Sequence, residues 1–235
     1  MKTKQFFLSL FIFGFVFSNA AFAEREEREV SSFSEISLRI SGKVHLEQGN
    51  RQRVRVEAKS STLEEIITEV KGRELIIRFK SNNIFRRSFN PGRVDIYITV
   101  PEINALSVSG SGDIIADSKI KSRILDLTVS GSGDISLKNL DAERVKAAVS
   151  GSGNILIGKG RTADEFEVAI SGSGNVKAEN FEAKNVNAKI SGSGSCRVNA
   201  VDYLKARVAG SGNVLYKGNP QIDTSVMGSG RVKKL

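Results

Sequence analysis

Apolar and polar residues alternate along most of the chain, and the same four residues interrupt this alternation at nearly regular intervals. The quartet Ser-Gly-Ser-Gly, with Ala or Met as the first residue in two of its copies, starts at seven positions: Ser109, Ser130, Ser150, Ser171, Ser191, Ala209 and Met227. On both sides of each quartet every second residue is apolar, as in "ILDLTVSGSGDISL". A period of two predicts β-strands that bury one side against a core.

The spacing of the quartets predicts how these strands are arranged. Successive quartets start 18 to 21 residues apart, and a repeat of this length fits one coil of a solenoid with two short strands. The Asn-Gly and Asp-Gly pairs that are typical of β-hairpins are missing. We therefore predict an all-β fold, a parallel β-helix-like solenoid of about 20-residue coils, in which equivalent residues stack about 4.8 Å apart.

The quartet itself is predicted to form a tight corner of each coil. Glycine tolerates backbone conformations that other residues avoid, and an inward side chain at the corner would collide with the neighbouring coils. The serines would then face outward. The residue that follows each quartet would form a column of mostly polar side chains: Asp113, Asp134, Asn154, Asn175, Ser195, Asn213 and Arg231.

The part of the chain before the quartets is rich in strand patterns but irregular. The segment "ISGKVHLEQG" resembles a first coil that has lost one glycine. Residues 61–70 fit either a short helix or a bend followed by a strand at 66–70, and we favour the bend because "ELIIRFK" follows as a strand partner. We expect one solenoid domain over residues 24–235, with irregular coils in 24–105 and quartet coils in 106–235.

The first 23 residues have the parts of a secretory signal peptide. Lys2 and Lys4 precede an uncharged apolar run of 13 residues, and "NAAFA" offers small residues that favour cleavage after Ala23. The run is shorter than the roughly 20 apolar residues of a membrane-spanning helix. We therefore expect residues 1–23 to be a signal peptide. The remainder would be exported to the periplasm, the outer-membrane surface or the medium, without a transmembrane helix.

The charge of the chain adds little about its partners. Without Lys2 and Lys4 the net charge falls from +9 to +7, and the remaining basic residues are scattered along the sequence. A basic surface favours anionic partners such as an acidic glycan or lipopolysaccharide, although scattered charge more simply keeps a protein soluble. Export argues against nucleic acid as a partner, and an envelope protein is an equally open alternative.

Several quoted segments together resemble one bacterial family. These are "FSEISLRISGKVHLEQGNRQRVRVEA", "VDIYITVPEINALSVSGSGDI" and the repeated quartet followed by Asp or Asn and then Ile or Val. Over most of residues 30–230 the chain is similar to the "putative auto-transporter adhesin, head GIN domain" family, a domain of unknown function. The resemblance implies a parallel β-helix-like solenoid and an envelope or extracellular location in Gram-negative bacteria. It brings no catalytic motif with it.

The candidate chemistry along the chain is sparse. The glycines precede strand patterns rather than a helix, which disfavours a phosphate-binding loop. Calcium takes roughly 6–8 oxygen ligands, and only two members of the polar column carry a carboxylate, so we expect no metal site. Those two, Asp113 and Asp134, would stack on neighbouring coils and could divide acid and base roles in glycan cleavage. The single cysteine, Cys196, replaces an apolar residue, and we expect it to be buried rather than to pair with His45.

The polar, turn-rich stretch 81–93 is predicted to be a surface loop and holds the best candidates for partner contact. Arginine and aromatic residues are enriched at binding hot spots, and this loop combines both kinds: Phe85, Arg86, Arg87, Phe89 and Arg93. The alternative interpretation is a solvated insertion with its phenylalanines packed onto the solenoid.

These observations favour an exported, non-enzymatic β-solenoid. We predict an adhesin-like binding protein or a scaffold of the cell envelope that needs no cofactor. Two alternatives stay open at this stage. One is a glycan-active enzyme that uses Asp113 and Asp134, and the other is a structural protein that stacks end to end.

Overall fold

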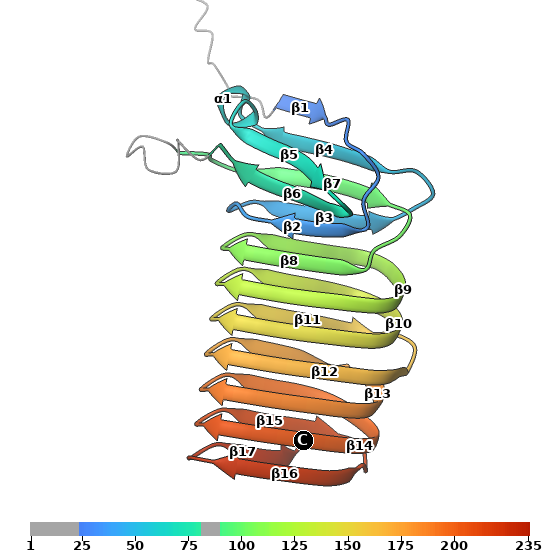
Figure 1. Cartoon of the computed structure of the whole chain (residues 1–235), viewed down its shortest axis with the longest axis vertical. Coiled ribbons are helices and arrows are strands. Elements are labelled where there is room, and N and C mark those ends of the chain that lie inside the picture. The colour runs from blue at the N-terminus through green and yellow to red at the C-terminus, as the bar shows by residue number, and fades with distance from the viewer. Residues whose placement is uncertain (1–23, 81–89) are drawn as a thin grey trace, which may run out of the picture.

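The computed structural model describes residues 24–80 and 90–235 as a stack of β-coils topped by less regular strands (Figure 1). The predicted signal peptide, 1–23, and four of the predicted contact residues, Phe85, Arg86, Arg87 and Phe89, lie outside the described residues. The prediction of an all-β solenoid with coils of about 20 residues is confirmed, because each quartet lies directly against the next one in parallel register.

The elements run in chain order from the irregular end to the regular end. The elements before the first quartet coil are β1 (Glu24–Glu27), β2 (Glu35–Leu38), β3 (Lys43–Gln48), β4 (Arg53–Ala58), α1 (Ser60–Leu63), β5 (Ile66–Lys71), β6 (Glu74–Phe79) and β7 (Asp95–Val100). The following strands are β8 (Ala105–Gly110), β9 (Asp113–Gly131), β10 (Asp134–Gly151), β11 (Asn154–Lys159), β12 (Ala163–Gly172), β13 (Asn175–Gly192), β14 (Ser195–Gly210), β15 (Asn213–Lys217), β16 (Gln221–Met227) and β17 (Arg231–Lys234).

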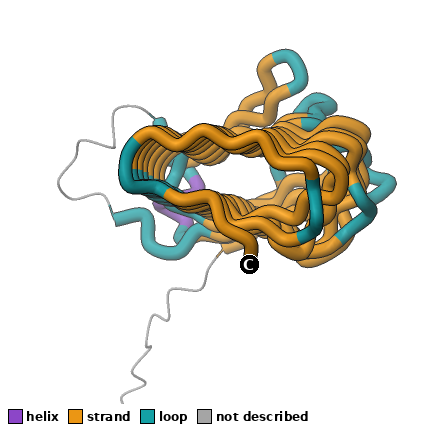
Figure 2. Tube along the Cα trace, turned by 90° about the horizontal axis from the view of Figure 1, so that it is seen from below, coloured by secondary structure: helices purple, strands orange, loops and turns teal. Residues whose placement is uncertain are grey.

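Every coil contributes to two opposite layers, which Figure 2 shows end-on as the two long sides of a flattened ring. We call the outer surface of the segments that follow the quartets the post-quartet face, and that of the segments that precede them the pre-quartet face. Strands β3, β7, β4 and β1 extend the post-quartet layer beyond β9. Strands β2, β6 and β5 extend the pre-quartet layer beyond β8.

The core lies between the two layers and consists of the inward residues of both. Alternate residues such as Leu125, Leu127 and Val129 are fully buried, as the period of two predicts. Most inward side chains are aliphatic. Phe166 and Phe181 are the aromatic exceptions within the regular coils, and their rings pack edge to face with centroids 5.8 Å apart. Such a pair adds about 0.5–1.5 kcal/mol beyond the burial of its apolar area.

The corners of the coils show why the quartets carry glycine. The first glycine of a quartet has a positive φ, for example +126° at Gly131, where side chains other than glycine are strained. The second glycine lies against the preceding coil. A Cβ atom on Gly133 would be 2.0 Å from the carbonyl oxygen of Gly112, so no side chain fits there. The predicted role of the glycines is therefore correct for both positions.

The course of the chain between corners differs from the prediction of two short strands. Strands β9, β10, β13 and β14 are continuous over 16 to 19 residues and carry the chain around the far bend without a break. A shift of register between Leu137 and Asn139 marks this bend in β10. A bulge bends a strand while most of its ladder hydrogen bonds survive, so the far bend of these four coils does not require glycine. The two coils whose chain breaks at this bend do carry glycine there: a Cβ on Gly160 would lie 1.7 Å from the carbonyl oxygen of Leu140, and one on Gly218 would lie 1.9 Å from that of Ala200.

The irregular end departs from parallel stacking. Strand β4 is antiparallel to β7, β1 is antiparallel to β4, and β5 and β6 form a hairpin. The favoured bend at 61–70 is correct, since α1 is a single turn and β5 begins at Ile66. The register of β2 and β3 places Ile40 where the next coil has Gly110, which explains the lost glycine. Among the described residues no helix is long and apolar enough to cross a membrane.

Candidate functional site

The polar column behind the quartets acts as a hydrogen-bonded ladder. Asp113 Oδ1 accepts a hydrogen bond from the backbone N–H of Asp134 at 3.2 Å, and Asp134 Oδ1 accepts two from Asn154, both at 2.8 Å. The side-chain amide of Asn175 donates to Asn154 Oδ1 at 2.9 Å. Both carboxylates therefore bind the next coil, and this accounts for their position without a catalytic role.

Metal and thiol chemistry find little support in the part of the chain that the structure describes. No group of three or more His, Cys, Asp or Glu residues there could hold a metal ion. Cys196 is fully buried, as expected, and burial raises the pKa of its thiol to about 12. A thiol with this pKa is protonated at neutral pH and is a poor nucleophile.

Of the predicted contact residues, Arg93 is the one that the structure describes. It lies beside a cluster of polar and charged side chains. Its guanidinium is largely exposed, and Nε donates to Oδ2 of Asp95 at 2.5 Å. The other carboxylate oxygen of Asp95 accepts a hydrogen bond from His45 Nε2 at 3.0 Å. Asp95 is buried, and its carboxylate lies between the guanidinium of Arg93 and the imidazole of His45.

The pKa of Asp95 reflects these contacts. Burial raises the pKa of this carboxyl, but the hydrogen bonds from Arg93 and His45 outweigh burial and hold the pKa below its ordinary value. Asp95 is therefore ionised at neutral pH. A histidine oriented by a buried carboxylate is also part of catalytic triads, but no Ser or Cys side chain among the described residues is hydrogen-bonded to His45.

Three side chains next to this carboxylate form a stack across three strands. The rings of His45 and Tyr97 lie 4.7 Å apart at an angle of 13°, and Cζ of Arg55 lies 4.5 Å from the centre of the Tyr97 ring. The pairing of β3, β7 and β4 places these residues side by side on the post-quartet face. Glu57 Oε1 lies 3.3 Å from Arg55 Nε and forms an ion pair with this guanidinium.

The stack borders a cavity of about 280 Å³, which we call the arginine–tyrosine pocket. Its polar lining comes from strands β3, β4 and β7 and consists of His45, Glu47, Arg53, Arg55, Tyr97 and Thr99. The lining thus carries two guanidinium groups, an imidazole, two hydroxyls and one acidic side chain. An arginine that is stacked on an aromatic ring and held by a carboxylate is pre-organised to bind a carboxylate, phosphate or sulfate.

Sequence reasoning missed this pocket although it recorded the strands that form it. His45, Arg55 and Tyr97 all occupy outward positions of alternating segments, "KVHLEQ", "RVRVEA" and "VDIYITV". Each side chain alone is ordinary for an exposed strand position. The register between three strands far apart in sequence brings them together, through a parallel pairing of β3 with β7 and an antiparallel pairing of β4 with β7.

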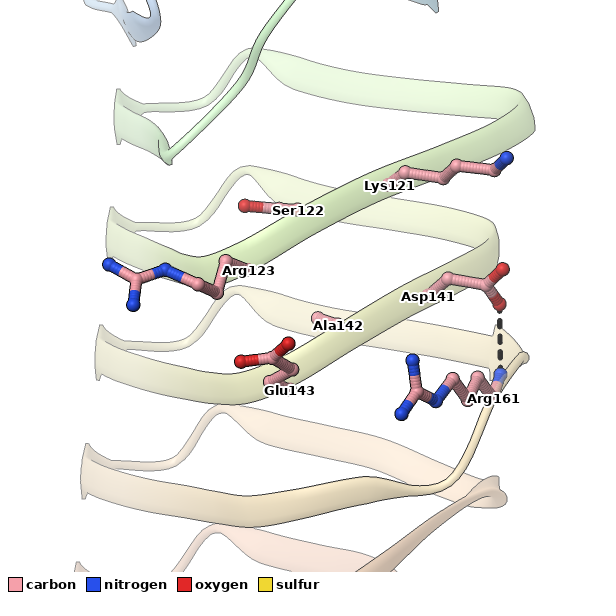
Figure 3. Close-up of a pocket in the computed structure, with 7 residues that line it drawn as sticks. All are labelled: Lys121, Ser122, Arg123, Asp141, Ala142, Glu143 and Arg161. Atoms are coloured by element: carbon pink, nitrogen blue, oxygen red, sulfur yellow. Dashed lines mark hydrogen bonds between the residues drawn. The ribbon is translucent and has the colours of Figure 1, made fainter.

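A larger depression of about 490 Å³ lies at the far bend of the coils (Figure 3). Its lining alternates in charge over three successive coils and consists of Lys121, Ser122, Arg123, Asp141, Ala142, Glu143 and Arg161. Asp141 accepts hydrogen bonds from the backbone N–H of Arg161 at 2.9 Å and from Lys119 at 3.1 Å. These contacts, the first above all, lower the pKa of Asp141. Opposite charges alternate between neighbouring coils here and no aromatic side chain lines the depression, so we favour the arginine–tyrosine pocket, where Arg55 lies over the Tyr97 ring.

The described residues thus form stacked parallel coils, the architecture of a β-solenoid. The model of the family described as "Putative auto-transporter adhesin, head GIN domain" matches residues 32–220. This chain therefore belongs to that family, and the predicted resemblance is confirmed.

Solved structures share the fold over nearly the whole chain. A "putative adhesin" from Bacteroides fragilis superposes with a TM-score of 0.83 at 24% identity, over 90% of this chain and 96% of that one. A "putative lipid binding protein" from Parabacteroides distasonis gives a TM-score of 0.75 at 26% identity, over 92% and 98%. A "putative adhesin" from Parabacteroides distasonis gives a TM-score of 0.72 at 26% identity, over 90% of this chain and 96% of that one. Among curated proteins no significant relative of the chain was found.

Proposed function

We propose that this protein is an exported, non-enzymatic, adhesin-like protein of the cell envelope, and that it binds an anionic group of an envelope glycan in the arginine–tyrosine pocket. The observation that carries the proposal is the guanidinium of Arg55, held over the Tyr97 ring inside a cavity with Arg53 and His45. Arginine and tyrosine are among the residues enriched at binding hot spots. The adhesin description of the family supports a binding role.

The chemistry of the pocket favours a carboxylate, sulfate or phosphate on the ligand. Both faces of the Tyr97 ring are in use, since His45 stacks on it and the Arg55 guanidinium lies over it. A neutral sugar therefore has no free aromatic platform here. A negative group, in contrast, could form two parallel hydrogen bonds with the fork of one arginine.

Glycan-array binding by the purified protein tests the proposal. We expect acidic glycans to bind, and Arg55→Ala to weaken binding by about tenfold or more. Arg55→Lys keeps the charge but loses the planar fork, so it should restore little affinity. The matched control is Arg123→Ala, which removes an arginine from the depression at the far bend and should leave binding unchanged.

Two results would contradict the proposal. Equal binding by the wild type and Arg55→Ala would remove the pocket from the binding site. Turnover of an acidic polysaccharide that disappears in Asp134→Asn would instead favour the enzymatic alternative. Fractionation of cells that carry the gene checks the location, because the proposal expects the protein in the periplasm, in the outer membrane or in the medium.

A further inference from the structure

Charge is distributed unevenly along the solenoid, in contrast to the scattered pattern inferred from the sequence. Residues 106–170 hold eight Lys and Arg and nine Asp and Glu, a net charge of −1. Residues 171–235 hold ten Lys and Arg and four Asp and Glu, a net charge of +6. The positive charge of the regular coils therefore belongs to the coils nearest the C-terminal end, the orange and red coils of Figure 1.

On the post-quartet face of these coils basic residues occupy three of four successive positions of one column. Lys177 pairs in register with Arg197, Arg197 with Leu215, and Leu215 with Lys233. Arg231 and Lys217 lie on either side of this column, on the same outward surface. We call these exposed residues the basic ladder: Lys177, Arg197, Lys217, Arg231 and Lys233.

The ladder has few partners of its own. Among the described residues, Arg197 is the one member with an ion pair, at 3.5 Å from Glu179. Lys217 donates a hydrogen bond to the side chain of Asn180 at 3.3 Å. Opposing acids are thus sparse on this face, and unbalanced charge on an exposed surface is available to an anionic partner.

The geometry points to a second binding surface, at which the basic ladder holds a linear acidic polysaccharide lying along the solenoid axis. Successive rungs repeat at the strand spacing of about 4.8 Å, so Lys177 and Lys233 are about 14 Å apart. A polymer with one carboxylate on each sugar offers charges at a comparable repeat. The surface lies at the opposite end of the face from the arginine–tyrosine pocket, so this inference goes beyond the proposed function.

The side chains around the ladder favour a polysaccharide over other polyanions. The polar column beside it supplies Asn175, Ser195 and Asn213, and Asn199 lies on the other side; amides and hydroxyls of this kind bind sugar hydroxyls. Single-stranded nucleic acid would want aromatic side chains on which its bases stack. The outward positions of this face between residues 175 and 234 contain none.

Binding of polygalacturonate, a linear polymer with one carboxylate per sugar, tests this inference on the whole protein. The test variant reverses three lysines of the ladder: Lys177→Glu, Lys217→Glu and Lys233→Glu. The control reverses three exposed lysines of the pre-quartet face: Lys146→Glu, Lys189→Glu and Lys205→Glu. We expect the ladder variant to lose at least about tenfold in affinity and the control to change by less than about threefold.

Further measurements sharpen the comparison. Fully methyl-esterified polygalacturonate should not bind, since it lacks the charges, and higher salt should weaken binding of the free polymer. Oligomers should gain affinity with length up to about four sugars, the span of the ladder. Thermal unfolding of both variants verifies that they fold, and a triple Lys→Gln variant removes the charges without reversing them.

Several outcomes would overturn the inference. Equal losses of affinity in the ladder variant and the control variant would show that the polymer is held by general charge attraction and not by the basic ladder. Preference for phosphatidylglycerol vesicles over polygalacturonate would assign the ladder to a membrane surface. Loss of polygalacturonate binding in Arg55→Ala with full binding in the ladder variant would refute the ladder while leaving the proposed function intact. Binding that survives Arg55→Ala but not the ladder variant supports a separate surface.

Discussion

The two ends of this solenoid use the same strand pattern for different purposes. In the quartet coils equivalent residues lie against each other in parallel register, so that glycine meets glycine and Asn154 meets Asn175. At the irregular end the parallel pair β3–β7 and the antiparallel pair β4–β7 place unlike residues together, and a histidine, a tyrosine and an arginine stack across three strands. Regular coils therefore align identical side chains into ladders, whereas the irregular strands bring different side chains together around the arginine–tyrosine pocket.

The corners show the same contrast. In the quartet coils a Cβ on the second glycine would overlap backbone atoms, whereas a Cβ on Gly42, at the equivalent corner of the irregular end, would have its nearest neighbour 3.3 Å away on Val94. The irregular corner already tolerates Ile40 in place of a glycine. Close stacking of the quartet coils therefore requires glycine at the corners, whereas the more widely spaced corner of the irregular end does not.

Gly133→Ala should have the largest effect on stability. Its Cβ would lie 2.0 Å from the carbonyl oxygen of Gly112, so two backbones must separate, and we expect a loss of about 4 kcal/mol or more. Gly42→Ala is the matched control and should cost about 1 kcal/mol or less. Urea unfolding measures both, and equal losses would refute the argument that the spacing of coils sets the glycine requirement.

Asp95→Asn should weaken the irregular end by about 1–3 kcal/mol, since two charge-assisted hydrogen bonds to a buried group are lost. The pKa of Asp95 is lowered in the folded protein. Its contribution is therefore present above the ordinary carboxyl pKa of about 3.9 and disappears as the pH falls through the lower folded value.

Unfolding of Asp95→Asn at a series of pH values checks this sign. The difference from wild type should shrink as the pH drops below about 4. Asp164→Asn, which removes an exposed carboxylate paired with Lys184 in the regular coils, should show little difference at any pH. A difference for Asp95→Asn that grows on acidification would contradict the assigned pKa direction.

Asn154→Ala should destabilise the quartet coils by about 1–2 kcal/mol, because it breaks the side-chain hydrogen bonds to Asp134 and from Asn175. Asn187→Ala, at an exposed position of the pre-quartet face, is the control and should change stability by less than about 0.5 kcal/mol. Chemical denaturation of the pair tests whether the polar column contributes energy or only fills an outward position.

Cys196→Val should have the smallest effect, less than about 1.5 kcal/mol, because it replaces one small buried apolar group with another. The native thiol should also resist alkylation at pH 8, since burial raises its pKa to about 12, and should react after denaturation. Rapid alkylation of the native protein would show that the coil around Cys196 opens readily.

Sequence periodicity was sufficient to predict the regular coils, because equivalent residues there repeat at a fixed spacing and need only one register. It predicted the glycine corners, the polar column from Asp113 to Asn213 and the buried Cys196 from the same spacing. It did not predict the pocket around Arg55 and Tyr97. That site depends on one parallel and one antiparallel pairing between segments without a repeat, and many registers of such segments satisfy the same alternation.

The carbonyl group of the first glycine in a quartet also links successive coils. The carbonyl oxygen of Gly110 accepts two hydrogen bonds from the next quartet, from the N–H groups of Ser132 and Gly133 at 2.8 and 2.9 Å, and that of Gly131 does the same one coil later. Every corner thus presents the acceptor that the following corner requires. A gene encoding such a protein can gain or lose a whole coil by duplication or deletion, and the chain on either side of the junction would find matching partners.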